Sequence, residues 1–360
     1  MASTLTRFAK SLGLRLPLVQ APMAGVSTPQ LAAEVSKCGG LGSLGLGASD
    51  VDTARAAIRS ARQLGATLLN ANFFCHAPPK TNEQQEAVWL SALAPLFVQF
   101  GAQPPRTLQE PYSSFIADDQ MQQMVVEEAP EVVSFHFGLP PADVTHALKM
   151  TGCTLFATAT SESEASACAR AGMDAVIVQG IEAGGHRGRF VYDEDDRALP
   201  MLELMESLKQ NTGVQVPLIA AGGMMDGKDC VTALNAGADL VQLGTAFVLC
   251  AESASDDGYR AALMQSEKAT DTVLTSVFSG RPARALRNAM VEFGESKPRE
   301  SVPEYPLVFE ASKALHAAGK EHGDHSCGAH WAGMGAPRAR NLRAAELMQV
   351  LADEMSRASS

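Results

Sequence analysis

The stretch that decides the fold consists of "VPLIAAGG" (216–223), "DGKDCVTALNAG" (226–237) and "ADLVQLGT" (238–245). The first and third segments are short apolar runs that lead into glycine, which is typical of buried strands. The middle segment begins with Asp and ends with Gly, as capped helices do. A strand, a helix and a second strand in this order predict a parallel β–α–β unit.

The same unit repeats along the first 253 residues. Further apolar runs predict strands at 16–23, 40–47, 67–74, 131–138, 154–160 and 174–180. Amphipathic stretches that open on Ser, Thr or Asp predict helices between them, among others at 28–39, 50–65 and 161–172. Eight strands that alternate with helices predict an α/β fold of the (β/α)8 type, a TIM barrel.

The chain is longer than such a barrel requires. A barrel of this type uses about 250 residues, whereas the chain has 360. The surplus lies in two segments, a helical insertion after the third strand (76–130) and a C-terminal extension (254–360). Since neither is joined by a flexible linker, we expect one catalytic unit. Residues 16–75 and 131–253 form its barrel, and the extension caps the site.

The composition excludes several classes of function. Hydrophobic residues make up 46% of the chain and charged residues 19%, which is sufficient for a large core. A net charge of −11 argues against a nucleic-acid partner. The best apolar run (240–251) is too short to cross a membrane and contains Gln242. We expect a monomer or homodimer without a membrane partner.

The cysteines and the N-terminus bear on location. The seven cysteines are odd in number and form no CxxC pair, so we expect reduced thiols. Residues 1–33 contain three basic residues and no acid, which resembles an organellar targeting composition. However, the first strand is expected near Leu16, which leaves little to cleave. A cytoplasmic location is therefore favoured.

The ends of the last two barrel strands are rich in glycine. Active sites of such barrels lie at the carboxyl ends of the strands, and the loops after strands seven and eight commonly hold a phosphate. Gly222 and Gly223 end the seventh strand, and Gly244 and Thr245 end the eighth. Backbone N–H groups there can approach an anion. One glycine pair alone would indicate a tight turn, but two glycine-containing strand ends at these paired positions predict a phosphorylated cofactor.

Other strand ends carry amides and one histidine. Asn70 and Asn72 lie in the third strand and Gln179 in the sixth. Singly, each is more often a core amide, but together they suit a heterocycle with carbonyl and imino groups. His186 follows in "VIVQGIEAGGHRGRF" (176–190) after Gly184 and Gly185. It is either a solvent-facing residue of a glycine turn, or an active-site residue whose space the glycines clear.

Two further patterns are weaker. Gly40, Gly42 and Gly45 fit GxGxxG, but they lie in a predicted strand that a helix precedes, so we reject a nicotinamide site. The tail stretch "HGDHSCGAH" (322–330) contains potential metal ligands, namely His322, His325, Cys327 and His330. Their spacing matches no recognised zinc site, so a polar loop without metal is expected.

Eight motifs resemble those of the FMN-dependent nitronate monooxygenases, formerly called 2-nitropropane dioxygenases, in their class I branch. The motifs occur in order from residue 20 to residue 315. They are "QAPMAGVSTP", "GGLGSLG", "NANFFCH", "SFHFG", "VQGIEAGGHRG", "AAGGMMDG", "QLGTAFVLC" and "PEYPLVFEASKAL". The resemblance implies FMN as cofactor and the oxidation of alkyl nitronates, such as propionate 3-nitronate, by O2. The products are a carbonyl compound and nitrite, which fits a role in detoxification.

The resemblance also assigns roles to residues. The catalytic histidine falls on His186. The flavin contacts fall on Met23, Asn72, Gln179 and Gly184, and the phosphate site falls on Gly222, Gly223, Gln242, Leu243, Gly244 and Thr245. Substrate-side residues fall on Tyr112, Tyr305, Phe309 and Lys313. Phe309 stands where close relatives have a tyrosine, which affects the expected substrate preference.

Alternatives remain at this level. An NAD(P)H-dependent flavin reductase acting on quinones or enoyl thioesters would use the same barrel. A phosphosugar isomerase or aldolase would use the phosphate site for its substrate, but such enzymes usually need a Lys or Glu at a strand end. The interpretation as a metal-binding or scaffold protein is supported only by the histidines of the tail.

Overall fold

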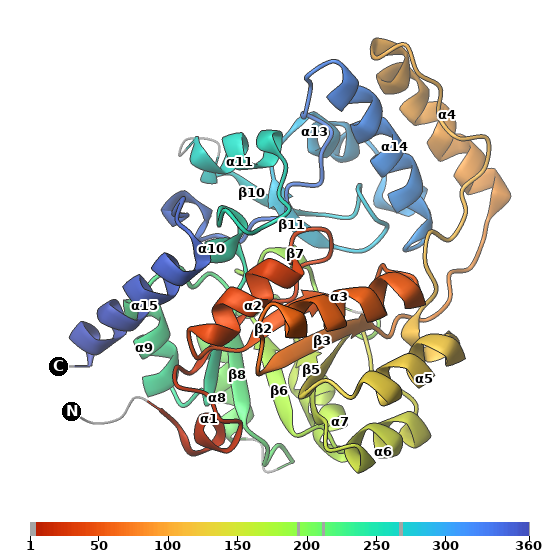
Figure 1. The fold of residues 1–360 in the computed structure, drawn as a ribbon. Coiled ribbons are helices and arrows are strands. Elements are labelled where there is room, and N and C mark those ends of the chain that lie inside the picture. Colours follow the sequence, from red (N-terminus) through yellow and green to blue (C-terminus); the bar gives the residue numbers. More distant parts are fainter. Residues whose placement is uncertain (1–4, 193–194, 211–212, 266–268, 360) are drawn as a thin grey trace.

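A nearly closed barrel forms the centre of the structure. The computed structural model describes residues 5–192, 195–210, 213–265 and 269–359. In these residues eight parallel strands follow one another in the order β1-β9-β8-β6-β5-β4-β3-β2. They are β1 (Leu18–Gln20), β2 (Gly42–Gly45), β3 (Leu69–Phe74), β4 (Val132–His136), β5 (Thr154–Ala159), β6 (Ala175–Gln179), β8 (Leu218–Ala221) and β9 (Leu240–Leu243). A bridge from Val19 to Leu41 joins the two end strands (Figure 1). The eight expected strands are therefore confirmed.

Helices surround this barrel on its outer side. They are α2 (Pro29–Lys37), α3 (Val51–Gln63), α5 (Asp119–Glu128), α6 (Ala142–Met150), α7 (Glu162–Arg170), α8 (Met201–Gln210) and α9 (Gly227–Asn235). Four helices begin as their sequences predict. The side chains of Thr28, Asp50, Ser161 and Asp226 accept hydrogen bonds from the backbone N–H three residues on. Such caps satisfy donors that a helix start leaves free.

The strands present alternate residues to two different cores. In β6, Val176 and Val178 belong to the core shared with the surrounding helices, whereas Ile177 belongs to a separate cluster. Because neighbouring strand residues point to opposite faces, this second cluster fills the inside of the barrel. Helix α1 (Arg7–Ser11) contributes Ala9 to it. The same alternation points residue 179 inward, at the carboxyl end of the strand.

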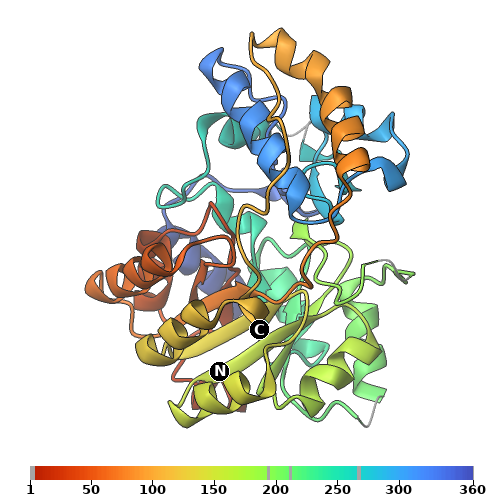
Figure 2. The ribbon, with the colours of Figure 1, turned by 90° about the vertical axis from the view of Figure 1, so that its right-hand side faces the viewer.

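The segment between β3 and β4 contains α4 (Glu83–Gln99), the short helix η1 (Phe115–Ala117) and α5. Helix α5 packs against α3 and α6 as a barrel helix does. Helix α4 lies away from the barrel and packs instead against α14 (Leu307–Glu321) of the C-terminal part (Figure 2). Trp89 of α4 and Leu315 of α14 lie in one apolar cluster.

A second, three-stranded antiparallel sheet lies above the barrel. It consists of β10 (Thr272–Thr275), β11 (Ala283–Leu286) and β7 (Gly185–His186), with β11 in the middle. His186 pairs with Ala283, so the loop after β6 is tied to the C-terminal part. This sheet was not expected from the sequence. Its strand β7 has only two residues, which are too few to show an alternation of polar and apolar side chains.

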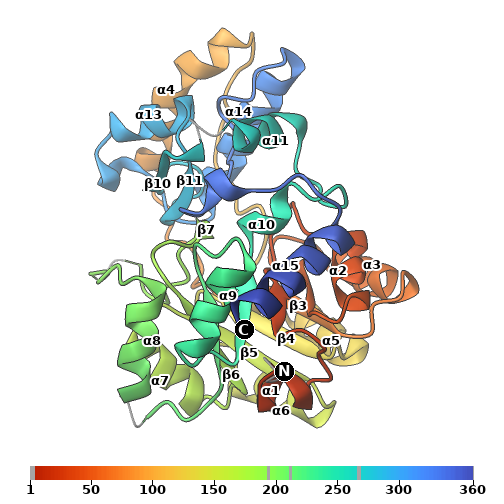
Figure 3. The same cartoon turned by 90° about the vertical axis from the view of Figure 1, so that its left-hand side faces the viewer.

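The remaining helices of the described residues follow β9. They are α10 (Thr245–Val248), α11 (Asp257–Met264), α13 (Ala289–Glu295), α15 (Ala344–Ala358) and the short helices η2 (Arg299–Ser301) and η3 (Ala336–Arg338). Helix α15 returns to the barrel and packs on α9 and α2 (Figure 3). At this contact a Cβ on Gly227 would meet the backbone of α15. None of the described helices combines the length and apolarity needed to cross a membrane.

Candidate active site

Polar side chains at the carboxyl ends of four barrel strands share one pocket. They are Asn72 of β3, His136 of β4, Gln179 of β6 and Gln242 of β9. All four alternate with residues of the outer core, so they point into the mouth of the barrel. Strand parity, together with the parallel order, therefore assembles the site at the barrel end where such enzymes place it.

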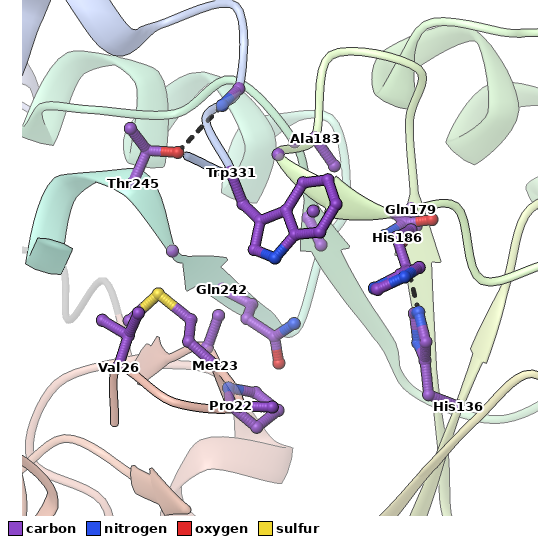
Figure 4. Close-up of a pocket in the computed structure, with 18 of the residues that line it drawn as sticks. Pro22, Met23, Val26, His136, Gln179, Ala183, His186, Gln242, Thr245 and Trp331 are labelled. Atoms are coloured by element: carbon purple, nitrogen blue, oxygen red, sulfur yellow. Dashed lines mark hydrogen bonds between the residues drawn. The ribbon is translucent and has the colours of Figure 1, made fainter. Parts of the chain in front are cut away.

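Most residues that were expected at the site line this pocket. They are Met23, Asn72, Tyr112, Gln179, Gly184, His186, Gly222, Gly223, Gln242, Gly244, Thr245 and Phe309. In Figure 4 the indole of Trp331 reaches into the pocket, with Met23 and Gln242 on one side and His186 on the other. The structure thus brings together loops from both halves of the barrel and from the C-terminal part.

Three expected residues do not line the pocket. Leu243 points outward and belongs to the core shared with the helices. Tyr305 is buried behind the wall, and its hydroxyl lies 2.9 Å from that of Tyr112. Lys313 lines a neighbouring cavity, with its Nζ 5.6 Å from the ring centroid of Phe309.

His186 is held through both its backbone and its ring. Its carbonyl oxygen accepts a hydrogen bond from Nε2 of Gln179 (2.9 Å) and lies 3.2 Å from Nε2 of His136. Its own Nε2 lies 2.8 Å from Oγ of Ser279. The rings of Phe137, Tyr305 and Trp331 surround the imidazole at centroid distances of 5.5, 5.5 and 5.1 Å.

These surroundings keep the imidazole of His186 neutral. Burial is the largest cause that lowers its pKa from 6.5 to about 3, and repulsion from His136 and Arg281 acts in the same direction. An active-site imidazole can act as a cation when it is protonated or as a base when it is not. A neutral imidazole can accept a proton but contributes no positive charge, so the geometry favours a base.

His136 is a second neutral imidazole in the pocket. Burial is the main cause that lowers its pKa to about 4. Because a carbonyl oxygen only accepts, its Nε2 donates to His186 and its Nδ1 accepts from Oγ1 of Thr158, 3.0 Å away. The protonated nitrogen is thus defined, and the ring fixes the backbone of His186.

Gly184 and Gly185 have structural roles that differ from the one expected from the sequence. A Cβ on Gly184 would lie 2.5 Å from the backbone nitrogen of Gly333, so the close approach of the tail loop excludes a side chain there. Gly185 has open space around its Cα but a φ of +73°, which glycine adopts at little cost. The glycines thus admit the tail loop and the turn into β7, rather than clearing space around the imidazole.

The expected phosphate site is a backbone surface: none of the described residues that line the pocket is a Lys or Arg, and Arg338 approaches only from outside, where it donates to the carbonyl oxygen of Gly223. Gly222 and Gly223 have φ values of +139° and +68°, and Gly244 and Thr245, which follow the neighbouring strand β9, line the same pocket. Oγ1 of Thr245 already accepts a hydrogen bond from the N–H of Gly333. Oε1 of Gln242 is buried without a partner among the described residues. A ligand with a hydrogen-bond donor at this point would satisfy that oxygen, so the residues present fit a flavin.

Several residues of the site were missed from the sequence. His136 lies near the end of an expected strand, in "SFHFG", and this position at a strand end could have identified it as a site residue. Tyr259 and Trp331 line the pocket from α11 and from the tail loop. Ser279 reaches His186 from the segment between β10 and β11. The last three had no signal, since their positions depend on how the C-terminal part folds back.

The GxGxxG pattern has a packing role in the structure. Gly42 and Gly45 lie in β2 instead of opening a helix. A Cβ on Gly42 would meet the backbone of Ala32 in α2, and one on Gly45 would lie 2.5 Å from the nitrogen of Ala24. The glycines of this strand therefore allow α2 and the loop after β1 to pack closely.

Fold and site together define a (β/α)8-barrel enzyme with its pocket at the carboxyl ends of the strands. The chain belongs to the nitronate monooxygenase family, whose model, described as "Nitronate monooxygenase", matches residues 6–354.

Named relatives agree with this assignment. The chain is 49% identical to the nitronate monooxygenase of Paraburkholderia phytofirmans, over 96% of this chain and 93% of that protein. It is 46% identical to the nitronate monooxygenase of Pseudomonas aeruginosa, over 97% and 99% of the two chains.

Solved structures that are similar to this chain in fold include the following two. A nitroalkane oxidase from Streptomyces ansochromogenes has a TM-score of 0.88 and 36% identity, and the match covers 98% of this chain and 99% of that one. FabK from Thermotoga maritima has a TM-score of 0.71 and 27% identity, with coverages of 98% and 97%.

Proposed function

We propose that the protein oxidises alkyl nitronates, such as propionate 3-nitronate, with O2 to a carbonyl compound and nitrite, in the detoxification of nitro compounds. The observation that carries this proposal is His186, a neutral imidazole on the wall of the one pocket that gathers the expected residues. A neutral nitroalkane must lose its α-proton before it becomes a nitronate, and an unprotonated imidazole is suited to remove it.

FMN is the proposed cofactor. The nitronate monooxygenase family implies a flavin, and the proposal of FMN is supported by the glycine-containing strand ends at residues 222–223 and 244–245, which line one pocket and offer backbone N–H groups to a phosphate. Asn72 and Gln242 would hold the ring system, and the glycine N–H groups would hold the phosphate. When bound, a flavin supplies the redox chemistry by taking electrons from the nitronate and passing them to O2.

The chain itself contributes positioning and exclusion of water. Ser279 and the backbone contacts of His136 and Gln179 fix the imidazole of His186. Phe309 and Tyr112 form an aromatic side of the pocket, with ring centroids 6.4 Å apart. Burial raises the pKa of Tyr112, so its hydroxyl stays protonated, and this hydroxyl donates a hydrogen bond to Oη of Tyr305.

We further propose that residues 76–130 and 254–360 act as a cap on one catalytic unit. Support comes from the apolar cluster that α4 and α14 share and from the pocket residues that the tail contributes, such as Trp331. A cytoplasmic location is also a proposal, supported by the fact that all seven cysteines, each among the described residues, are free. A monomer or homodimer is the proposed assembly state.

An anaerobic mixing experiment tests the function. In one experiment the purified protein with its flavin is mixed without oxygen with propionate 3-nitronate. In a second experiment it is mixed with NADH, and the flavin absorbance is followed in both. We expect rapid bleaching by the nitronate and none by NADH. The reverse result would support the NAD(P)H-dependent flavin reductase, the alternative that would use the same barrel.

A further inference from the structure

A cluster of metal-ligating side chains lies outside the active-site pocket. Asp256 precedes α11, His316 lies on α14, and His325 lies in the loop after α14. Each offers a ligand-type atom, and these atoms all lie within 4.8 Å of one another. In the part of the chain that the structure describes, no other group of three His, Cys, Asp or Glu residues meets this condition.

The fold fixes the three side chains at this place. Oδ1 of Asp256 accepts a hydrogen bond from the N–H of Tyr259 and so caps α11. Its Oδ2 lies 3.2 Å from Nε2 of His316, and its Oδ1 lies 3.6 Å from Nδ1 of His325. A Cβ on Gly258 would overlap the imidazole of His325, so this ring packs directly on the first turn of α11.

Three buried imidazole nitrogens around the cluster lack a hydrogen-bond partner among the described residues. They are Nδ1 of His316, Nδ1 of His325 and Nε2 of His330. His330 is only 5% exposed; its ring stacks on Tyr259 and lies 6.1 Å from that of His316. A buried polar atom without a partner costs free energy, so several such atoms at one place require a cause.

We propose that Asp256, His316 and His325 bind a divalent transition-metal ion of the zinc class, in the cap and apart from the active site. Imidazole nitrogen and carboxylate oxygen are ligands that Zn²⁺ accepts in proteins. Water or His330 is available to complete the coordination. Such an ion would join α11, α14 and the loop that carries Trp331 into the active-site pocket, and it would therefore stabilise the cap.

The charge of the cluster supports a cation at this place. The carboxylate of Asp256 is surrounded by the N–H of Tyr259, the ammonium group of Lys320 and the imidazole of His316. Nζ of Lys320 lies 3.1 Å from Oδ2 of Asp256, and its side chain is 45% exposed. This ammonium group neutralises the carboxylate without an ion, and it can turn into solvent when an ion binds.

The proposal departs from the expectation of a metal-free polar loop at 322–330. That expectation rested on the spacing of His322, His325, Cys327 and His330. In the structure, His322 lies at the end of α14 beside Phe100, and Cys327 lies in the apolar cluster of the cap. Asp256 and His316 come instead from distant parts of the chain, and no local spacing rule detects them.

Zinc binding by the full chain with its flavin tests this proposal. The protein is treated with a chelator, dialysed against Zn²⁺ alone, and its metal content is measured. We expect one zinc per chain in the wild type and in the control variant His322→Gln. In His316→Gln and His325→Gln the affinity should fall at least about tenfold, since even outer partners of a metal site change affinity by 10- to 100-fold.

Two further measurements sharpen the outcome. Lys320→Met should bind zinc more tightly than the wild type, because it removes the competing ammonium group. Zinc should raise the melting temperature of the wild type and of Lys320→Met but not that of His316→Gln, as binding to the folded state alone stabilises it. Flavin content and circular dichroism show that the variants fold. The proposal is overturned if folded wild-type protein retains no zinc, or if all four variants retain it equally.

Discussion

Oγ of Ser279 lies 2.8 Å from Nε2 of His186, although the two residues are 93 positions apart in the chain. Ser279 belongs to the segment between β10 and β11, and His186 is the second residue of β7. The hydroxyl therefore engages one ring nitrogen of the proposed base from the side of the cap, which leaves Nδ1 as the other site for a proton.

Ser279→Ala should slow proton removal without disturbing the cofactor. A hydrogen bond of this kind contributes about 1 kcal/mol, so we expect kcat for a neutral nitroalkane to fall by about fivefold, with KM less affected. Ser279→Thr keeps the hydroxyl and should restore most of the rate. Equal kcat values for the alanine variant and the wild type would show that this contact does not position the ring.

His186→Asn should reduce the turnover of neutral nitroalkanes more than the turnover of nitronates. Asparagine keeps the backbone carbonyl that holds Gln179 and His136 but cannot act as the base. Turnover of a neutral nitroalkane should fall by about 10²–10⁴-fold, whereas turnover of the preformed nitronate should fall much less. Steady-state rates with both forms, together with flavin per chain, check this. Equal losses on both forms would exclude a role as base.

Phe309→Tyr should change the ranking of substrates. The ring of Phe309 lines the pocket beside Tyr112, and a hydroxyl there adds a donor and an acceptor to an apolar wall. We expect nitronates with a polar tail to gain about fivefold in kcat/KM relative to those with an alkyl tail. An unchanged ranking across chain lengths would mean that this position only packs.

Gly223→Ala should reduce flavin binding. The φ of +68° is unfavourable for alanine, and the added Cβ would lie 3.0 Å from that of Glu182 at the proposed phosphate site. Gly172→Ala is the matched control, because Gly172 also has a positive φ but lies between α7 and β6, away from the pocket.

Mass spectrometry of the flavin released by heat should identify FMN, and FAD would contradict the proposed cofactor.

Acid should destabilise the fold through its buried histidines. Burial is the main cause that lowers the pKa of His76 and His186 to about 3, whereas an unfolded histidine has a pKa of about 6.5. Between these values the unfolded state binds protons that the folded state does not. The free energy of unfolding should therefore decrease as the pH falls from about 7 toward 3, by about 1.4 kcal/mol per pH unit for each such histidine.

His76→Phe tests this assignment of the acid sensitivity. Neither ring nitrogen of His76 has a hydrogen-bond partner among the described residues, so phenylalanine loses no such bond. Urea unfolding at several pH values should show a shallower decrease for the variant. Identical slopes for variant and wild type would show that His76 is not one of the titrating groups.

The barrel and its pocket follow from local sequence patterns, whereas the cap does not. Apolar runs and helix caps predict each barrel strand, and strand parity then orients Asn72, Gln179 and Gln242. Leu243 shows the limit of this reasoning, because its neighbours in the motif line the pocket while its own side chain faces the helices. The two-residue strand β7 and the contact of Ser279 with His186 arise only when distant segments pair, and no short pattern encodes them.

The pairing of β7 with β11 ties the proposed base to the C-terminal part as well as to the barrel strands that hold its carbonyl oxygen. A nascent chain that has reached residue 253 carries every barrel strand and His186 itself, but not the strand against which that histidine is oriented. The strand pairing that orients the proposed base can therefore form only after every barrel strand has been synthesised. A chimera that exchanges caps between related barrels must move residues 185–186 together with residues 283–284, or it separates the base from its support.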